Sequence, residues 1–121
     1  MSPEDQLQIA VVDYLTLVLP KDIEFNHCPN GGNRNMIEAK KLKRMGTRAG
    51  WPYIQFLRNG RVSFIELKRP DWRDGRQKRK AVLSNEQKYL RERLVKQGCP
   101  YAVCRSIDEV AGTLKGWGML K

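Results

Sequence analysis

Hydrophobic positions recur at helical spacing at the start of the chain, over residues 3–19. The recurring apolar positions are Leu7, Val11, Leu15 and Val18. Ser2 can cap this helix, and Pro20 ends it because proline cannot supply a backbone donor. The pattern predicts an amphipathic helix with one face buried.

Two different patterns follow along the chain. Residues 22–28 alternate apolar and polar, as in a half-buried strand. PNGGN at 29–33 is typical of a loop, and helical spacing resumes over 34–46, where Gly46 ends the segment. We therefore expect a strand, a loop and a second helix.

Residues 52–67 predict a β-hairpin, because Asn59-Gly60 is the dipeptide best suited to a type I′ turn. A two-residue turn at this point opposes positions whose numbers sum to 119. Tyr53 is then expected to face Glu66 across the ladder, with their β-carbons about 5 Å apart. Lys68 shares the face of Glu66, because strand side chains alternate with a period of two. Tyr53, Glu66 and Lys68 should therefore converge on one patch.

The remaining elements follow a segment of many cations, 69–80, which we expect to be a loop. Ser84 and Gln87 form a capping-box pattern that begins a helix. YAVC at 101–104 predicts a short strand, and Ser106 caps a closing helix. The expected order is αβαββαβα, an α/β fold in which helices flank a mixed β-sheet.

Length and charge restrict the class of protein. The 121 residues suffice for one core but not two, so we expect 1–121 to form a single domain. The chain has 23 basic and 13 acidic side chains, which gives a net charge of +10. This charge favours a polyanion partner, above all nucleic acid. Charge alone leaves a small RNA-binding protein open.

The cysteines and the apolar segments bear on the compartment. There are three cysteines without CxxC spacing, which argues against a disulfide scaffold or a zinc ribbon. The apolar stretch of the first helix is too short and too interrupted to cross a membrane. We expect a cytoplasmic protein with no membrane partner.

The 53/66/68 patch could support metal chemistry. Two carboxylates at positions 53 and 66, with a backbone carbonyl, would bind Mg²⁺ or Mn²⁺. Such a metal lowers the pKa of a bound water and stabilises the charge on a phosphate under attack. Lys68 could orient that water or stabilise the transition state. An exposed Glu-x-Lys pair is also common on ordinary strands, so the spacing by itself leaves a purely structural pair open.

Three segments together carry a family resemblance: GTRAGWPYI, FIELK and LSNEQ. They resemble the G-T-x-x-G-x-P-D, E-x-K and L-S-x-x-Q signature of VRR-NUC domains in the PD-(D/E)xK nuclease superfamily. HCPNGGNRN, and Glu4 followed by Leu7 and Gln8, are similar to stand-alone phage and bacterial members. The resemblance spans nearly the whole chain and is far more specific than Glu-x-Lys.

The resemblance implies a restriction-endonuclease-like fold and a metal-dependent DNA endonuclease. It further implies selectivity for branched DNA such as Holliday junctions, a homodimer, and a place in a bacterial cell, encoded by the host or by a phage. Carried over by position, Glu66 and the carbonyl of Leu67 would bind metal, and Lys68 would be the catalytic lysine. Gln87 would be the motif glutamine near the site, and Glu4 the acid of the first helix.

The sequence departs from this family at one position, where Tyr53 stands in place of the motif Asp. A neutral phenol is a poor ligand for a hard cation, so metal binding should be much weaker. Three explanations are open: an inactivating substitution in this chain, a degenerate nuclease retained for DNA binding, or migration of the acid elsewhere. Positions 51, 55 and 64 offer no such acid.

Cations gather in the 34–46 helix, just after it, and in the 69–80 segment. Clustered cations neutralise phosphates and gain affinity by counterion release. The residues expected to contact DNA are Lys43, Arg44, Arg48, Arg69, Arg73, Arg76, Lys78, Arg79 and Lys80, with Arg34 added by resemblance. Trp72, among them, could stack on an unpaired base.

Overall fold

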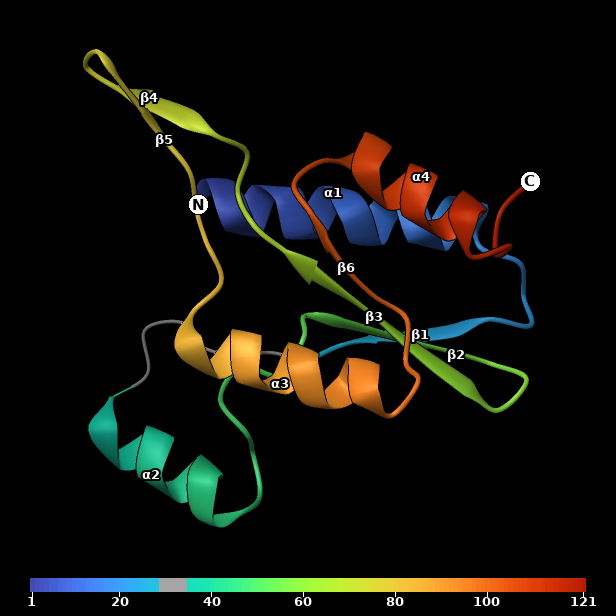
Figure 1. Cartoon of the computed structure of the whole chain (residues 1–121), viewed down its shortest axis with the longest axis horizontal. Coiled ribbons are helices and arrows are strands. Elements are labelled where there is room, and N and C mark those ends of the chain that lie inside the picture. The colour runs from blue at the N-terminus through green and yellow to red at the C-terminus, as the bar shows by residue number, and fades with distance from the viewer. Residues whose placement is uncertain (29–34) are drawn as a thin grey trace.

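The computed structural model describes residues 1–28 and 35–121 (Figure 1). The helices are α1 Pro3–Val18, α2 Met36–Arg44, α3 Asn85–Lys96 and α4 Ile107–Gly116. The strands are β1 Glu24–His27, β2 Ile54–Arg58, β3 Arg61–Leu67, β4 Trp72–Asp74, β5 Gln77–Arg79 and β6 Tyr101–Cys104. The eight expected elements are all present, in the expected order and close to their expected bounds.

The prediction of a loop over 69–80 was wrong, because β4 and β5 pair there as a separate two-stranded antiparallel sheet. Gly75, at φ +63°, and Arg76 connect the strands, with the positive φ at the first position that a type II′ turn requires. The strands are mostly polar on both faces, so no alternation of hydrophobic residues announces them. The element order is therefore αβαββββαβα.

The main sheet is mixed, with strand order β1-β2-β3-β6. The first two pairings are antiparallel, and β3 pairs with β6 in parallel. Ile54 pairs with Ile65 and Arg58 with Arg61, which is the expected register. Asn59 and Gly60 both have positive φ, 50° and 74°, as a type I′ turn requires. The predicted α/β class and the central hairpin are confirmed.

Helices cover both faces of this sheet. Figure 1 shows α1 and α4 side by side on one face and α3 on the other. Fully buried side chains of the larger core include Leu15, Phe56, Ile65 and Leu114. Burial of each such side chain contributes about 1.5–3 kcal/mol of hydrophobic free energy. The central hairpin thus shares a buried core with α1 and α4.

The starts of three helices are fixed by serine caps. The side chains of Ser2, Ser84 and Ser106 each accept a hydrogen bond from a backbone N–H three residues on, at 3.1, 3.2 and 3.1 Å. These three predicted caps are confirmed, and each stabilises its helix by about 1 kcal/mol.

The connection that precedes β2 is locked against the start of α3. Gly50, at φ +84°, lies so near that a β-carbon there would be 2.5 Å from the Glu86 carbonyl carbon and 2.8 Å from the Gln87 nitrogen. A side chain at this position would therefore clash with the helix backbone. The GTRAG and LSNEQ segments are in direct contact for this reason.

Two parts of the fold project from this body. The helix α2 has no buried residue, and Figure 1 shows it standing away from the sheet. The β4–β5 hairpin extends from the opposite side. Across residues 1–28 and 35–121, no helix is both long enough and apolar enough to span a bilayer.

Candidate active site

Glu66 is the centre of the candidate site. Its side chain is fully buried, and within the described residues neither carboxylate oxygen has a hydrogen bond of regular geometry. Burial raises its pKa to about 8, against the opposing effects of the Lys68 charge and the Tyr53 backbone, and Glu4 raises it further. A buried carboxyl without partners is costly unless a proton or a cation compensates it.

Tyr53 occupies the position that faces Glu66 in the observed register. Its ring packs on His27, with centroids 5.2 Å apart, and its carbonyl accepts a hydrogen bond from the Cys28 N–H at 2.7 Å. Burial raises the pKa of the phenol, and the negative charges of Glu4 and Glu66 raise it further. The phenol is therefore neutral at physiological pH.

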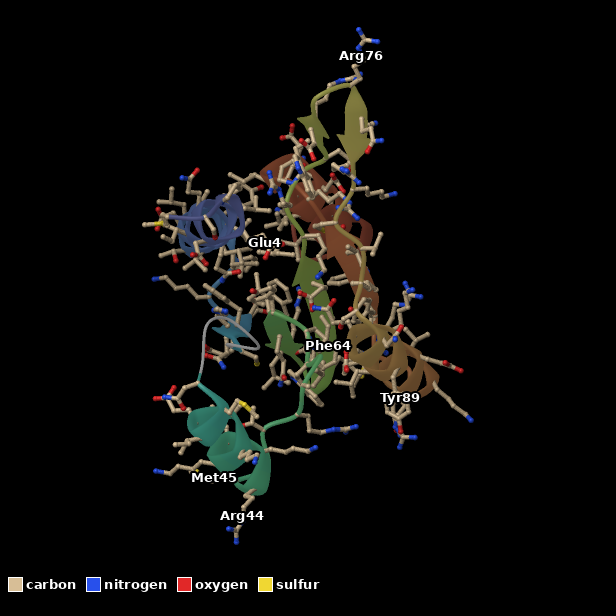
Figure 2. The ribbon with its side chains drawn as sticks, turned by 90° about the vertical axis from the view of Figure 1, so that its left-hand side faces the viewer. Glu4, Arg44, Met45, Phe64, Arg76 and Tyr89 are labelled. Atoms are coloured by element: carbon tan, nitrogen blue, oxygen red, sulfur yellow. The ribbon has the colours of Figure 1, made fainter. Side chains whose placement is uncertain are left out.

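Glu4 and Lys68 complete the group. Glu4 lies in the first turn of α1, and its charge raises the pKa of both Tyr53 and Glu66. In Figure 2 Glu4 lies between α1 and the strands of the sheet. The Lys68 N–H donates to the Cys104 carbonyl at 3.0 Å, which extends the β3–β6 pairing by one residue. The structure thus brings the predicted positions 4, 53, 66 and 68 together.

The donor set fits a hard cation only in part. Glu66 offers two oxygens that make no hydrogen bond of regular geometry within residues 1–28 and 35–121, and Leu67 adds a carbonyl beside it. Over the described part of the chain, however, no three His, Cys, Asp or Glu side chains are grouped closely enough to hold a metal ion. Tyr53 stands where a further carboxylate would complete such a group. Glu66 thus offers a carboxyl group on this strand, and the facing position 53 offers none.

Gln87 takes part in the start of α3. Its Oε1 accepts a hydrogen bond from the Ser84 N–H at 2.9 Å, while its own N–H donates to the Ser84 hydroxyl. The predicted capping box is confirmed. A role for Gln87 in the chemistry stays a prediction.

Sequence reasoning gave no role in the site to three polar side chains. Gln8, His27 and Tyr101 each carry a buried polar atom with no hydrogen-bond partner in the described residues. Gln8 lies one helical turn beyond Glu4, a spacing that could have marked it. Burial raises the pKa of Tyr101, and the charge of Glu66 raises it further. Within the described residues, Gln8, His27 and Tyr101 therefore add further buried polar atoms without partners to those of Glu66.

The expected DNA-binding cations fall into two groups. Lys43 and Arg44 are on α2 and Arg48 follows it, whereas the others belong to the β4–β5 hairpin and its ends. Figure 2 shows Arg44 at one end of the molecule and Arg76 at the other, with Glu4 between them. Arg34 lies outside the described residues. The two groups therefore flank the candidate site and do not merge into one patch.

Comparison with known proteins finds a similar solved structure. A solved structure described as a "VRR_NUC domain protein" superposes with a TM-score of 0.71 at 27% sequence identity. The match covers 99% of this chain and 91% of that chain. No protein-family model matches, and no curated protein does. Sequence signature and fold agree, and together they support a VRR-NUC domain, which is a domain of nuclease type.

Proposed function

We propose that this domain binds DNA through its two cationic groups and hydrolyses phosphodiesters with Mg²⁺ or Mn²⁺, with Tyr53 weakening or abolishing that hydrolysis in this chain. One observation carries the proposal. Glu66 is buried beside Lys68, neither of its oxygens has a hydrogen bond of regular geometry in the described residues, and a phenol stands at the facing position.

Each residue of the site has a role in this proposal. Glu66, the Leu67 carbonyl and Glu4 would hold the cation, which when bound supplies an acidified water and stabilises charge on the phosphate. Lys68 would orient the attacking water or stabilise the negative charge that builds on the phosphate. Because the pKa of Glu66 is raised to about 8, a cation must displace a proton there. Metal binding should therefore strengthen as the pH rises through 8.

A second candidate function is DNA binding without chemistry. Its support is the absence of a three-ligand cluster in the described residues, together with the packing of Tyr53 on His27. A well-packed phenol at this position is expected in a domain that has lost its catalytic activity and keeps only DNA binding. This candidate requires salt-dependent DNA binding that is indifferent to Mg²⁺ or Mn²⁺.

The deciding experiment compares the chain with Tyr53→Asp. Mn²⁺ is titrated by calorimetry, and cleavage of a four-way junction is followed on a gel. We expect weak metal binding and no cutting from the chain as given, and both activities from Tyr53→Asp. Tyr53→Phe is the matched control, because it removes the hydroxyl without adding a carboxylate, and it should stay inactive.

Other outcomes would change the proposal. A Tyr53→Asp protein that folds and binds DNA but never cuts would favour the second candidate. Cutting by the chain as given would mean that another residue supplies the missing ligand.

Selectivity for branched DNA and a homodimer are also part of the proposal. Junction resolution needs two paired incisions, which a dimer with two-fold symmetry supplies. Sedimentation of the protein with and without a junction, alongside mapping of the nicks made by Tyr53→Asp, tests both points. Single nicks from a monomer would contradict them.

A further inference from the structure

The β4–β5 hairpin is not held in shape by burial. Its strands pair with each other and with no other strand of the described residues, and every residue of β5 is exposed. Figures 1 and 2 show it projecting from the body of the molecule, with Arg76 at the tip. Because the segment buries so little apolar surface, hydrophobic burial does not explain why it forms a β-hairpin of this composition.

Its charges are arranged for an anion. Residues 69–80 contain six cations and two carboxylates. Both carboxylates are engaged, Asp71 with Lys78 and Asp74 with Arg79, each at 3.5 Å. Arg73, by contrast, has no carboxylate partner in the described residues and lies directly opposite Lys78. Like charges in directly opposed positions are destabilising, and a nearby phosphate would relieve them.

The root of the hairpin is fixed by one side chain that follows β6. Arg105 donates to the Arg69 carbonyl at 3.2 Å and to the Ala81 carbonyl at 2.6 Å, so it ties together the two ends of the segment. The Arg69 guanidinium lies 3.7 Å from the centre of the Trp72 ring. Trp72 is therefore stacked at the root of the hairpin, which directly follows the strand that carries Glu66.

From this geometry we infer that the β4–β5 hairpin enters the major groove of a duplex arm beside the candidate site, an inference that rests on the proposed DNA binding. Strands of three residues are about 10 Å long and about 5 Å apart. A major groove about 12 Å wide and 8.5 Å deep admits such a ribbon, whereas a minor groove about 6 Å wide does not. The substrate is then DNA with an intact duplex arm.

The tip argues against a strand-splitting role. Gly75 and Arg76 form the turn, and neither offers the apolar wedge that proteins insert between base steps. Arg73 and Arg76 instead present guanidinium groups, which suit phosphates and guanine edges. The hairpin therefore binds a DNA duplex whose bases stay paired.

The first test measures binding of the full chain to a 20-base-pair duplex by fluorescence anisotropy over a range of salt. Arg73→Gln/Arg76→Gln should bind at least about tenfold more weakly at 0.1 M salt, and the magnitude of the salt slope should fall by about 1.8. The matched control, Arg61→Gln/Lys121→Gln, removes the same charge from the start of β3 and from the last residue, both outside the β4–β5 hairpin. It should change both quantities much less.

The second test identifies the groove. Methyl green, which occupies the major groove, should displace the chain from the duplex, and netropsin, which occupies the minor groove, should not. Arg73→Gln/Arg76→Gln should lose its sensitivity to methyl green.

The outcomes separate this inference from the proposed function. If the chain binds DNA but the hairpin and control variants behave alike, or netropsin alone competes, only the hairpin inference fails. Absence of DNA binding by the unaltered chain at low salt would overturn both.

Discussion

The fold contains two β-hairpins whose turns are alike and whose surroundings are opposite. Both have a two-residue turn that contains glycine, Asn59-Gly60 in one and Gly75-Arg76 in the other. The β2–β3 hairpin lies in the middle of the sheet with most of its side chains buried, and β4–β5 is almost wholly exposed. Turn chemistry gives both their shape, but only the first takes its stability from packing.

This difference separates two tasks of a nuclease-type domain. A site for a metal must be held within a fraction of an ångström, which a ribbon packed on both faces can do. A surface for phosphates needs charge and reach, which an exposed ribbon offers. Glu66 is on the first hairpin and Arg76 on the second, and β3 leads directly from one to the other. The comparison predicts different responses to mutation.

The largest expected difference is between aromatic residues of the two hairpins. Phe56 is fully buried between Phe25 and Trp117. Phe56→Ala should therefore lower the free energy of unfolding by about 3–5 kcal/mol. Trp72→Ala should reduce the free energy of unfolding by no more than about 1 kcal/mol, because Trp72 is only half-buried and its ring stacks on the Arg69 guanidinium. Urea unfolding followed by circular dichroism measures both. Equal losses would mean that the outer hairpin is part of the core.

The next effect concerns the pH dependence of stability. Since the pKa of Glu66 is raised from 4.5 to about 8, the folded state holds a proton that the unfolded state releases. The contribution of Glu66 to the free energy of unfolding should therefore be largest below pH 4.5, and it should be lost as the pH rises through 8. Glu66→Gln cannot ionise, and at pH 9 it should be more stable than the parent by on the order of 3 kcal/mol.

The check is urea unfolding at pH 5 and pH 9 without divalent metal. Parent and Glu66→Gln should have similar stability at pH 5 and diverge at pH 9. Glu24→Gln is a suitable control, since Glu24 is exposed at the start of β1. Curves for the parent and Glu66→Gln that stay parallel over this range would show that the Glu66 carboxyl is not held protonated.

Arg105→Ala should have a smaller effect on stability and a distinct effect on the outer hairpin. The substitution removes two hydrogen bonds to the root, at a cost of about 1–2 kcal/mol. Amide hydrogen exchange should quicken in β4 and β5 while β2 and β3 stay protected. Uniformly faster exchange across all four strands would contradict the independence of the two hairpins.

The smallest expected effect is a gain. Arg73→Gln removes a cation opposite Lys78 and should stabilise the protein by a few tenths of a kcal/mol at low salt. The gain should vanish at 1 M salt, where such charges are screened. A loss of stability would indicate that Arg73 has a partner that holds the hairpin together.

These two hairpins also show what the sequence could and could not predict. The inner one was predicted down to its register, because Asn59-Gly60 sets the turn and apolar residues mark the strands. The outer hairpin was not predicted, although Gly75 indicates a turn. Its strands are mostly polar on both faces, so they show no alternation of apolar and polar residues. Arg105, which fixes it, was also missed, since no local pattern predicts a bond to residues 24 and 36 positions away.

The candidate site was predictable to a similar degree. Positions 53, 66 and 68 follow from turn length alone, and the nearness of Glu4 follows from the family resemblance. What the sequence could not give is the complete burial of Glu66 and the raised pKa that results. Both depend on how the helices close over the sheet. The packing of Tyr53 on His27 likewise needs β1 beside β2.

The two bonds of Arg105 have a consequence for how this domain can change. By joining the carbonyls of Arg69 and Ala81, they close the outer hairpin at its base, so its length can vary without disturbing the sheet. Insertions or deletions between these residues are tolerable in a way that insertions in β2 or β3 are not. The segment 70–80 can thus vary in length and sequence while the rest of the domain keeps its fold. Such variation would let the same nuclease-type domain bind DNA of different shapes.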